Sequence, residues 1–218
     1  MKPEEFELLI IFLYTGDVQF KSVSELCSGL YVASLYKLSS LLSACTTRIQ
    51  EKLKEDSGNS LLILQLDERF NCRVDNAALF DQVDDLIKKD YRQILSSGVI
   101  DELESDTLKH LLQMDSISSV PEIEVFRALS RWTNARCVKN GIERVGENLQ
   151  KMAGDLIYLI RYNLIPLDIL GTEILTSGLV PESLFARIIG RCYNDKMEVP
   201  FCTESRDLKL STTVSKRK

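Results

Sequence analysis

The sequence predicts an all-α protein of about ten short helices, arranged as a bundle of stacked helix pairs. Along most of the 218 residues, apolar side chains recur every three or four positions, which is the period of an amphipathic helix. Glycine and proline fall between these periodic segments, where they end one helix and begin the next. Sustained alternation of apolar and polar residues, the signature of a half-buried strand, does not occur.

Three helices are expected in the first quarter of the chain. Residues 3–14 begin with a proline and two glutamates, which favour a first helical turn, and then become apolar on nearly every side. Part of such a helix lacks cover in a chain that starts at Met1, so we expect self-association or a gene product that continues upstream. Apolar stripes predict two more helices, at 22–32 and 34–53. The polar run 55–60 is the expected domain boundary.

Seven further helices are expected after this boundary. They are residues 61–70, residues 74–90, a helix capped by Ser105, residues 119–137, and short helices near 144–152, 166–176 and 181–192. In the helix at 74–90, the acidic side with Asp81, Asp84 and Asp85 is most simply a solvated face. The polar segment 196–218 ends in three basic residues, and we expect it to be disordered.

The clearest single helix is predicted between residues 119 and 137. Ser119 and Glu122 have the spacing of a capping box, in which each side chain bonds the backbone N–H of the other, and Pro121 favours a first helical turn. The apolar stripe that follows ends on the only tryptophan, Trp132. This pattern predicts a helix in the core of the protein.

Composition and charge exclude several classes of protein. The net charge of -5 and the pI near 5.1 argue against a nucleic-acid binder, which normally presents a basic face. No apolar run reaches the roughly 18 residues that a membrane span needs. Glutamates stand near the N-terminus where a signal peptide carries basic residues, so we expect a cytoplasmic protein that also enters the nucleus.

The residues that commonly carry catalysis are few and scattered. The six cysteines form no Cys-x-x-Cys pair, so we expect no metal site, and reduced thiols that mostly pack in the core. The only histidine, His110, lies in a leucine-rich helix without a nucleophile motif beside it. We therefore expect neither an enzyme nor a cofactor, while a Cys–His pair formed in space stays open as an alternative.

Residues 1–54 resemble the C-terminal part of a BTB/POZ domain. The segment 6–16 is similar to the family's apolar helix, which ends in a Tyr-Thr-Gly turn. The helix pair that follows in the family carries the pattern Ala-x-x-Tyr-x-Leu-x-x-Leu…Cys. This pattern is matched here by Ala33, Tyr36, Leu38, Leu41 and Cys45. The strands and helices that begin a full BTB domain and form its dimer interface have no counterpart in this sequence.

Residues 56–195 resemble a BACK domain, a helical module found next to BTB domains in ubiquitin-ligase adaptors. Residues 106–115 are similar to the family's Leu-x-x-Leu-Leu-x-x-Asp segment, and residues 122–132 to its Glu-x-x-Val-Phe-x-Ala-x-x-x-Trp segment. Residues 160–170 and 177–180 resemble the pieces that close the module. The subsequent residues 204–208 are similar to the segment after BACK in one family member, where discoidin-like domains come next.

The resemblance implies an adaptor that joins proteins in a cullin-3 ubiquitin ligase and binds a second copy of itself through the BTB part. The implied partner-binding residues are Tyr31, Ser34, Lys37, Leu61 and Phe70. Tyr36, Leu38 and Leu41 are more simply explained as core residues. The segment that the family inserts toward cullin-3 lies ahead of the first helix and has no match here. An alternative is therefore a BTB-type scaffold outside the ligases, such as a transcriptional or synaptic regulator.

Overall fold

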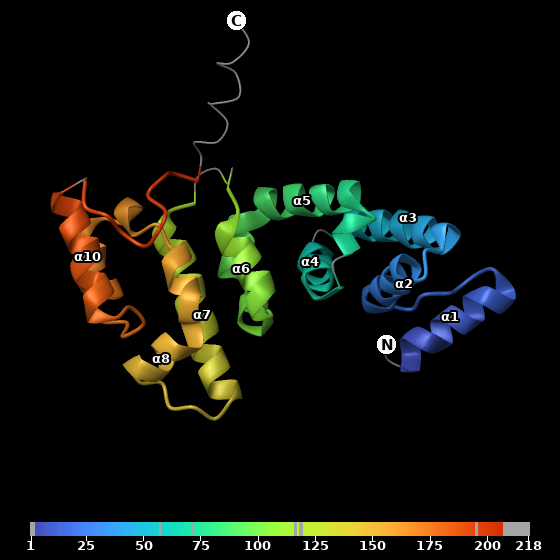
Figure 1. The fold of residues 1–218 in the computed structure, drawn as a ribbon, viewed down its shortest axis with the longest axis horizontal. Helices are drawn as coiled ribbons and strands as arrows, with labels where there is room; N and C mark the ends of the chain where they lie inside the picture. The colour runs from blue at the N-terminus through green and yellow to red at the C-terminus, as the bar shows by residue number, and fades with distance from the viewer. Residues whose placement is uncertain are drawn as a thin grey trace, which may run out of the picture. The chain divides into compact units, whose positions relative to one another are not determined.

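The computed structural model describes residues 3–56, 58–70, 72–115, 117, 120–194 and 196–206. Within these ranges the protein contains ten α-helices and no strand, so the all-α prediction is confirmed (Figure 1). The chain forms two compact units, residues 1–89 and 90–218, which we describe separately. None of the described helices combines the length and the apolarity that a bilayer span requires.

The first unit is built around α2 (Val23–Leu35), which packs against four other elements of the unit. Its neighbours are α1 (Pro3–Thr15), α3 (Ser39–Glu55), α4 (Asn59–Phe70) and the 3-10 turn η1 (Cys72–Val74). The unit also contains the first turns of α5 (Ala77–Ser96). Because α2 is central, most of its apolar side chains are buried, including Leu26, Leu30, Val32 and Ala33.

A glycine allows α2 and α3 to approach each other closely. A Cβ atom placed on Gly29 would lie 2.7 Å from the ring of Phe20 and 3.0 Å from the Cys45 sulfur. The start of α2 is fixed by its cap, because the Ser22 hydroxyl accepts a hydrogen bond from the Glu25 backbone N–H at 3.1 Å. The glycine thus sets how closely the middle of α2 packs on α3, and the cap sets where α2 begins.

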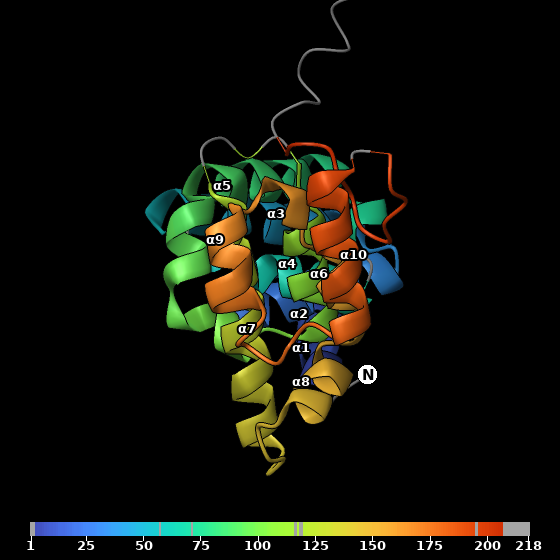
Figure 2. The same cartoon turned by 90° about the vertical axis from the view of Figure 1, so that its left-hand side faces the viewer.

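The second unit contains five α-helices and several shorter turns. After the last turns of α5, its elements are η2 (Gly98–Glu102), α6 (Ser105–Gln113), α7 (Glu122–Lys139), α8 (Gly146–Ala153), η3 (Gly154–Leu159), η4 (Tyr162–Leu164), α9 (Leu167–Ile169), the π-helical turn η5 (Leu170–Ile174) and α10 (Glu182–Tyr193). In two views, α8 lies at one end of this unit and the segment after α10 at the other (Figures 1 and 2). The core helix is α7, with Val125, Phe126, Leu129 and Trp132 buried.

One predicted cap differs from the structure, and another falls on a residue that the structure does not describe. Ser105 is the first residue of α6 rather than its cap, a position held by Glu104 without a side-chain hydrogen bond. The predicted capping partner of Glu122, Ser119, lies outside the described residues. The Glu122 carboxylate accepts hydrogen bonds from Arg161 and Arg206. These two arginines are distant in sequence, so a local cap pattern does not predict the contacts.

The segment after α10 also differs from the prediction. We expected disorder from residue 196 onward, yet residues 196–206 pack on the second unit, with Phe201 and Arg206 buried. The reason is that one aromatic ring and one paired guanidinium hold an otherwise polar segment in place. Residues 207–218 lie outside the described part of the chain.

Candidate protein-interaction surface

Residues 72–76 connect the helices of the first unit through polar side chains. The Arg73 guanidinium donates to Asp67 of α4 at 2.8 Å and to both carboxylate oxygens of Asp84 of α5 at 3.0 and 3.3 Å. Asn76 accepts a hydrogen bond from Thr46 of α3 at 3.1 Å. Partial burial lowers the pKa of Arg73, but the hydrogen bonds to Asp84 and Asp67 outweigh this effect and raise it. Charged groups thus hold this segment against α4 and α5, and a neutral hydrogen bond holds it against α3.

A second polar cluster joins the same segment to the end of α2. The Ser34 hydroxyl donates to the Asp75 carboxylate, and the Lys37 ammonium donates to both of its oxygens at 3.1 and 3.0 Å. Hydrogen bonds, first from Ser34 and then from Lys37, lower the pKa of Asp75. Lys37 has a φ of 55°, a left-handed conformation in the turn between α2 and α3.

Exposed apolar side chains surround this cluster. Leu35 and Tyr36, which lie between Ser34 and Lys37 in the sequence, are 51% and 46% exposed, and Val74 beside Asp75 is 74% exposed. Because Asp75 contacts both Ser34 and Lys37, the two exposed stretches lie next to each other. We call Leu35, Tyr36, Lys37, Val74 and Asp75 the α2–η1 surface. Exposed apolar side chains that lie next to polar groups make this surface a candidate protein–protein contact site.

Only part of the predicted partner-binding set lies on a surface. Ser34 and Lys37 belong to the polar cluster just described, and Tyr31 is half-buried one turn earlier. The expectation that Leu61 is exposed is wrong: it is 4% exposed, because α4 turns Leu61, Ile63 and Leu64 into the core. The side chain of Phe70 lies outside the described residues. Binding itself stays a prediction for these positions.

The three residues interpreted as core side chains have different environments. Leu41 is 1% exposed and packs in the core, and Leu38 is half-buried, whereas Tyr36 is 46% exposed. Sequence reasoning missed Leu35, Val74 and Asp75 altogether. Leu35 and Val74 carry no signal that separates an exposed from a buried apolar residue, and Asp75 lies 38 positions from Lys37.

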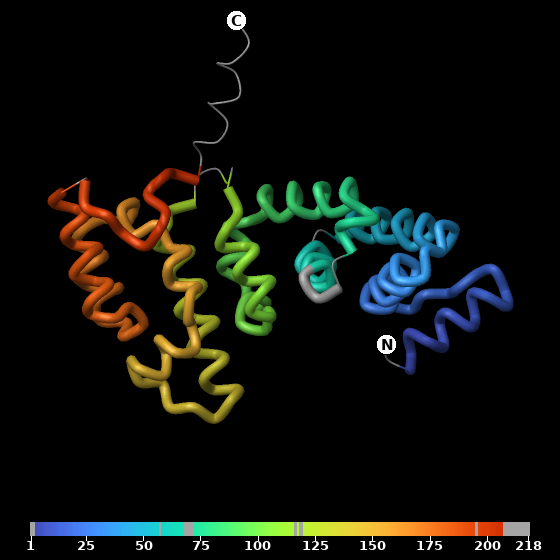
Figure 3. The backbone as a smooth tube through the Cα atoms, viewed as in Figure 1, coloured from blue at the N-terminus to red at the C-terminus, as the bar shows by residue number. Residues whose placement is uncertain are grey.

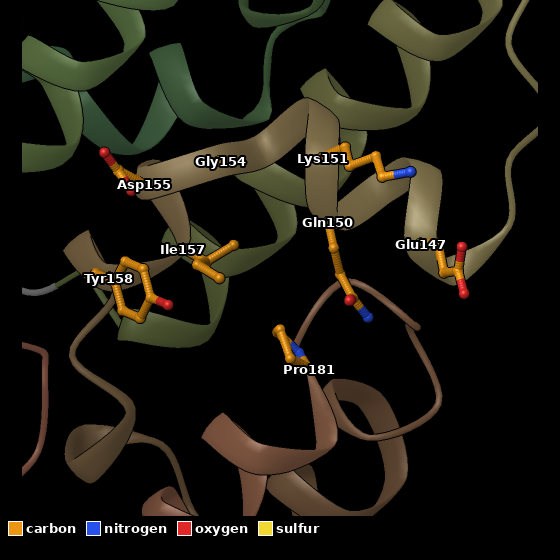
Figure 4. A pocket seen from close by; sticks show the side chains of 8 residues that line it. All are labelled: Glu147, Gln150, Lys151, Gly154, Asp155, Ile157, Tyr158 and Pro181. Carbon is orange, nitrogen blue, oxygen red and sulfur yellow. The ribbon is translucent and has the colours of Figure 1, made fainter.

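The second unit carries a shallow, open pocket of about 390 Å³ near α8 (Figure 4). Its lining residues are Glu147, Gln150, Lys151, Gly154, Asp155, Ile157, Tyr158 and Pro181. The Gln150 side chain already forms a hydrogen bond within the protein, because its amide nitrogen donates to the Gly178 carbonyl at 3.0 Å. The charged lining groups are spread over α8 and η3 and point to different sides of the opening in this view (Figure 4). The pocket therefore offers no converging set of polar groups for a small ligand.

Most of the cysteine side chains are buried. Cys27, Cys45, Cys72 and Cys137 are buried, while Cys192 and Cys202 are exposed. Burial raises the pKa of Cys45 and of Cys72 to about 12 and that of Cys27 further, so these thiols stay protonated near neutral pH. In the described part of the chain no group of three His, Cys, Asp or Glu residues is placed to hold a metal ion.

The helical fold and its exposed α2–η1 surface define a module suited to binding other proteins. The BACK family model ("BTB And C-terminal Kelch") matches residues 61–174, more than half of the chain, and the BTB/POZ domain model matches residues 1–53. The chain therefore belongs to the BTB–BACK family, and the resemblance drawn from its motifs is confirmed. The domain limits predicted at 54 and 195 stay predictions, and the two compact units divide elsewhere, within α5.

Curated relatives carry the same domain names. BTB/POZ domain-containing protein 6-A of Danio rerio is 24% identical over 161 residues, covering 74% of this chain and 28% of that protein. BTB/POZ domain-containing protein 3 of Homo sapiens is 23% identical over 180 residues, covering 83% of this chain and 33% of the relative. The chain thus spans about a third or less of the length of these relatives.

Proposed function

We propose that this chain is a non-catalytic protein-interaction adaptor that binds cullin-3 through the α2–η1 surface. The observation that carries the proposal is the cluster of Ser34, Lys37 and Asp75. It joins the two chain segments that carry the exposed side chains of Leu35, Tyr36 and Val74 before a partner arrives. A pre-formed contact surface binds more tightly because less side-chain entropy is lost on association.

The location of this surface in the family's domains supports the proposal. Leu35 and Tyr36 fall within the BTB match, and Val74 and Asp75 fall within the BACK match. The surface is therefore shared between the end of one domain and the beginning of the next. In this family, as the resemblance implied, the helices around that junction lie beside the cullin. We infer a cytoplasmic site of action, with entry into the nucleus as well.

Binding measurements with purified cullin-3 test the proposal. Tyr36→Glu or Val74→Glu brings a charge into the centre of the contact, where desolvation is costly, so each should raise the Kd at least about tenfold. Val138→Glu is the matched control, because Val138 is 63% exposed on α7 in the other unit. The control should bind cullin-3 as the unmodified chain does.

The same assay separates the ligase role from the alternative. If neither this chain nor a longer form that restores the family's preceding strands binds cullin-3, the ligase role is excluded and a scaffold outside the ligases remains. If cullin-3 binds but Tyr36→Glu and Val74→Glu leave its Kd unchanged, the proposed ligase role is retained and the α2–η1 surface is not the binding site. Replacing His110 by Ala tests the catalytic alternative, which requires that any measured activity be lost.

A further inference from the structure

The strap, defined as residues 196–206, is attached to the second unit through very few of its own side chains. It follows α10 and runs back across one end of that unit (Figure 3). Phe201 and Arg206 are the two buried residues of the strap, at 7% and 4% exposed, while Lys196, Glu198, Pro200, Cys202 and Glu204 are exposed. Most of the strap therefore contributes little apolar burial of its own.

Arg206 has a complete set of hydrogen-bond partners. Its Nε and Nη2 donate to the two carboxylate oxygens of Glu122 at 2.9 and 2.7 Å. Its Nη1 donates to the carbonyls of Leu112 at 2.6 Å and Met114 at 2.9 Å, and Nη2 also reaches the Leu159 carbonyl at 3.4 Å. A guanidinium has five N–H donors, and all five are used here.

These contacts join three separate parts of the second unit. Leu112 and Met114 end α6, Glu122 begins α7, and Leu159 ends η3. The same Glu122 carboxylate accepts the Arg161 backbone N–H at 3.0 Å, and the Arg161 side chain pairs with Asp115. Glu122 is almost fully buried, with a side chain 2% exposed. If a neutral side chain replaced Arg206 while the strap stayed in place, Glu122 would be a buried carboxylate without its paired cation, which is strongly unfavourable.

The rest of the strap is held by one aromatic ring, by the Met197 side chain, which packs closely against Gly190 of α10, and by isolated hydrogen bonds such as the one from Arg191 to the Met197 carbonyl at 3.1 Å. The Phe201 ring meets the buried Tyr162 ring edge to face, with centroids 5.3 Å apart. The Asn163 amide nitrogen donates to the Thr203 carbonyl at 2.8 Å, and Arg187 of α10 donates to the Glu198 carbonyl at 2.9 Å. Such contacts alone are too few to keep a segment of this length docked.

We propose that residues 196–206 form a latch that opens as a unit, is held mainly by Arg206 and Phe201, and loosens the α6–α7 junction when it opens. Closed, the latch supplies the cation that Glu122 requires. Open, it uncovers Glu122, Tyr162 and three backbone carbonyls. The state of the strap is thereby coupled to the order of the chain segments that meet at Glu122.

Cleavage by a glutamate-specific protease measures how often the latch is open. Glu204 is exposed, but a protease needs a locally unfolded segment, so the cleavage rate tracks the open population. Arg206→Gln should raise the cleavage rate at Glu204 about a hundredfold. Losing one partner of a buried ion pair should raise the population of the open strap by at least about two factors of ten. Phe201→Ala should raise it about tenfold or more. Hydrogen exchange of the Arg161 amide should speed up in Arg206→Gln as well.

Arg92→Gln is the matched control, because it removes an arginine–glutamate pair that also ends on α7. The Arg92 side chain is 68% exposed, so this pair contributes little and cleavage at Glu204 should change less than about twofold. A rate within twofold of the unmodified chain in Arg206→Gln would overturn the latch.

A urea titration of the unmodified chain covers the case in which Arg206→Gln fails to fold. Cys137 is buried in α7 and is alkylated only when that helix opens, which mass spectrometry distinguishes from labelling of Cys192 and Cys202. The latch requires cleavage at Glu204 to begin at a lower urea concentration than alkylation of Cys137. Coincident transitions would show that the strap is an inseparable part of the core and would overturn the proposal.

Discussion

Trp132 of α7 packs in the core and also forms a hydrogen bond through its ring N–H. Its indole is 3% exposed, and the ring N–H donates to the Leu103 carbonyl at 2.8 Å. The Arg136 guanidinium lies over the same ring, 5.3 Å from its centroid. The sequence placed Trp132 correctly on the buried face. The carbonyl and the arginine that complete its environment became apparent only in the structure.

Replacing Trp132 by Ala should destabilise the protein by about 3–5 kcal/mol, because it leaves a large cavity and removes one of the two hydrogen bonds to the Leu103 carbonyl. Val138→Ala in the same helix is the control, because Val138 is 63% exposed and should change stability by less than about 0.5 kcal/mol. Urea unfolding followed by circular dichroism gives both values. Equal midpoints for the two variants would contradict the packing described for α7.

Asp75 predicts a pH dependence of stability in the first unit. Its pKa is lowered in the folded state by Ser34 and Lys37, so its stabilising contribution is complete above the ordinary carboxyl value of 3.8. That contribution is lost as the pH falls through the lowered pKa. Asp75→Asn should therefore lose less stability than the unmodified chain between neutral pH and about pH 3. Urea midpoints measured across this range test the difference.

The control for this experiment is Asp85→Asn. Asp85 has an 80% exposed side chain and lies 3.8 Å from Lys88, so its removal should leave the acid slope close to that of the unmodified chain. Parallel curves for the unmodified chain and for Asp75→Asn would mean that the Ser34–Lys37–Asp75 cluster does not stabilise the fold.

At the scale of elements, the longer helices were predictable because each has its own apolar period, whereas the three-residue α9 was predicted only as part of a longer segment, 166–176. The 3-10 turns η1, η2, η3 and η4 were not predicted, since runs of three to six residues are too short to show a period. The interpretation of the acidic face of α5 as fully solvated was wrong at one of its three aspartates. Asp81 and Asp85 are solvated as expected, but Asp84 binds Arg73 from the neighbouring turn. The environment of Asp84 is therefore set by a contact between η1 and α5.

The close approach of α2 and α3 gives a prediction at this scale. Gly29→Ala should destabilise the first unit by about 1–3 kcal/mol, because the added methyl overlaps Phe20 and the Cys45 sulfur. The gain in helix propensity offsets only part of that cost. Gly98→Ala is the control, as a Cβ there meets nothing within 4 Å. Thermal unfolding compares the two, and a Gly29→Ala variant as stable as Gly98→Ala would contradict the close approach.

At the scale of the molecule, α1 presents an apolar surface that the described chain leaves open. Phe6, Ile11, Leu13 and Tyr14 are between 43% and 86% exposed. The all-round apolar pattern of this helix was recognised in the sequence, and a helix of that kind is expected to be covered on most sides. Self-association, which the family resemblance also implies, therefore stays a prediction for this chain.

We expect the mass of the protein in solution to exceed that of a monomer and to rise with concentration. Leu13→Arg should shift it toward the monomer, since a charge on α1 disfavours burial of this face. Tyr193→Arg is the control, because Tyr193 is 79% exposed on α10 in the other unit. Light scattering measures these masses. A monomer for the unmodified chain at all concentrations, with little binding of a hydrophobic dye, would contradict the prediction.

The sequence by itself determined the helical class, the approximate positions of the helices and the family, because periodicity and short motifs are local properties of the chain. Only the tertiary structure decided that Asp75 meets Ser34 and Lys37, that Leu61 is buried, and that Arg206 pairs with Glu122. Arg206 and Glu122 are 84 positions apart. Such pairs depend on how helices pack, and no local pattern records which distant side chain supplies the opposite charge.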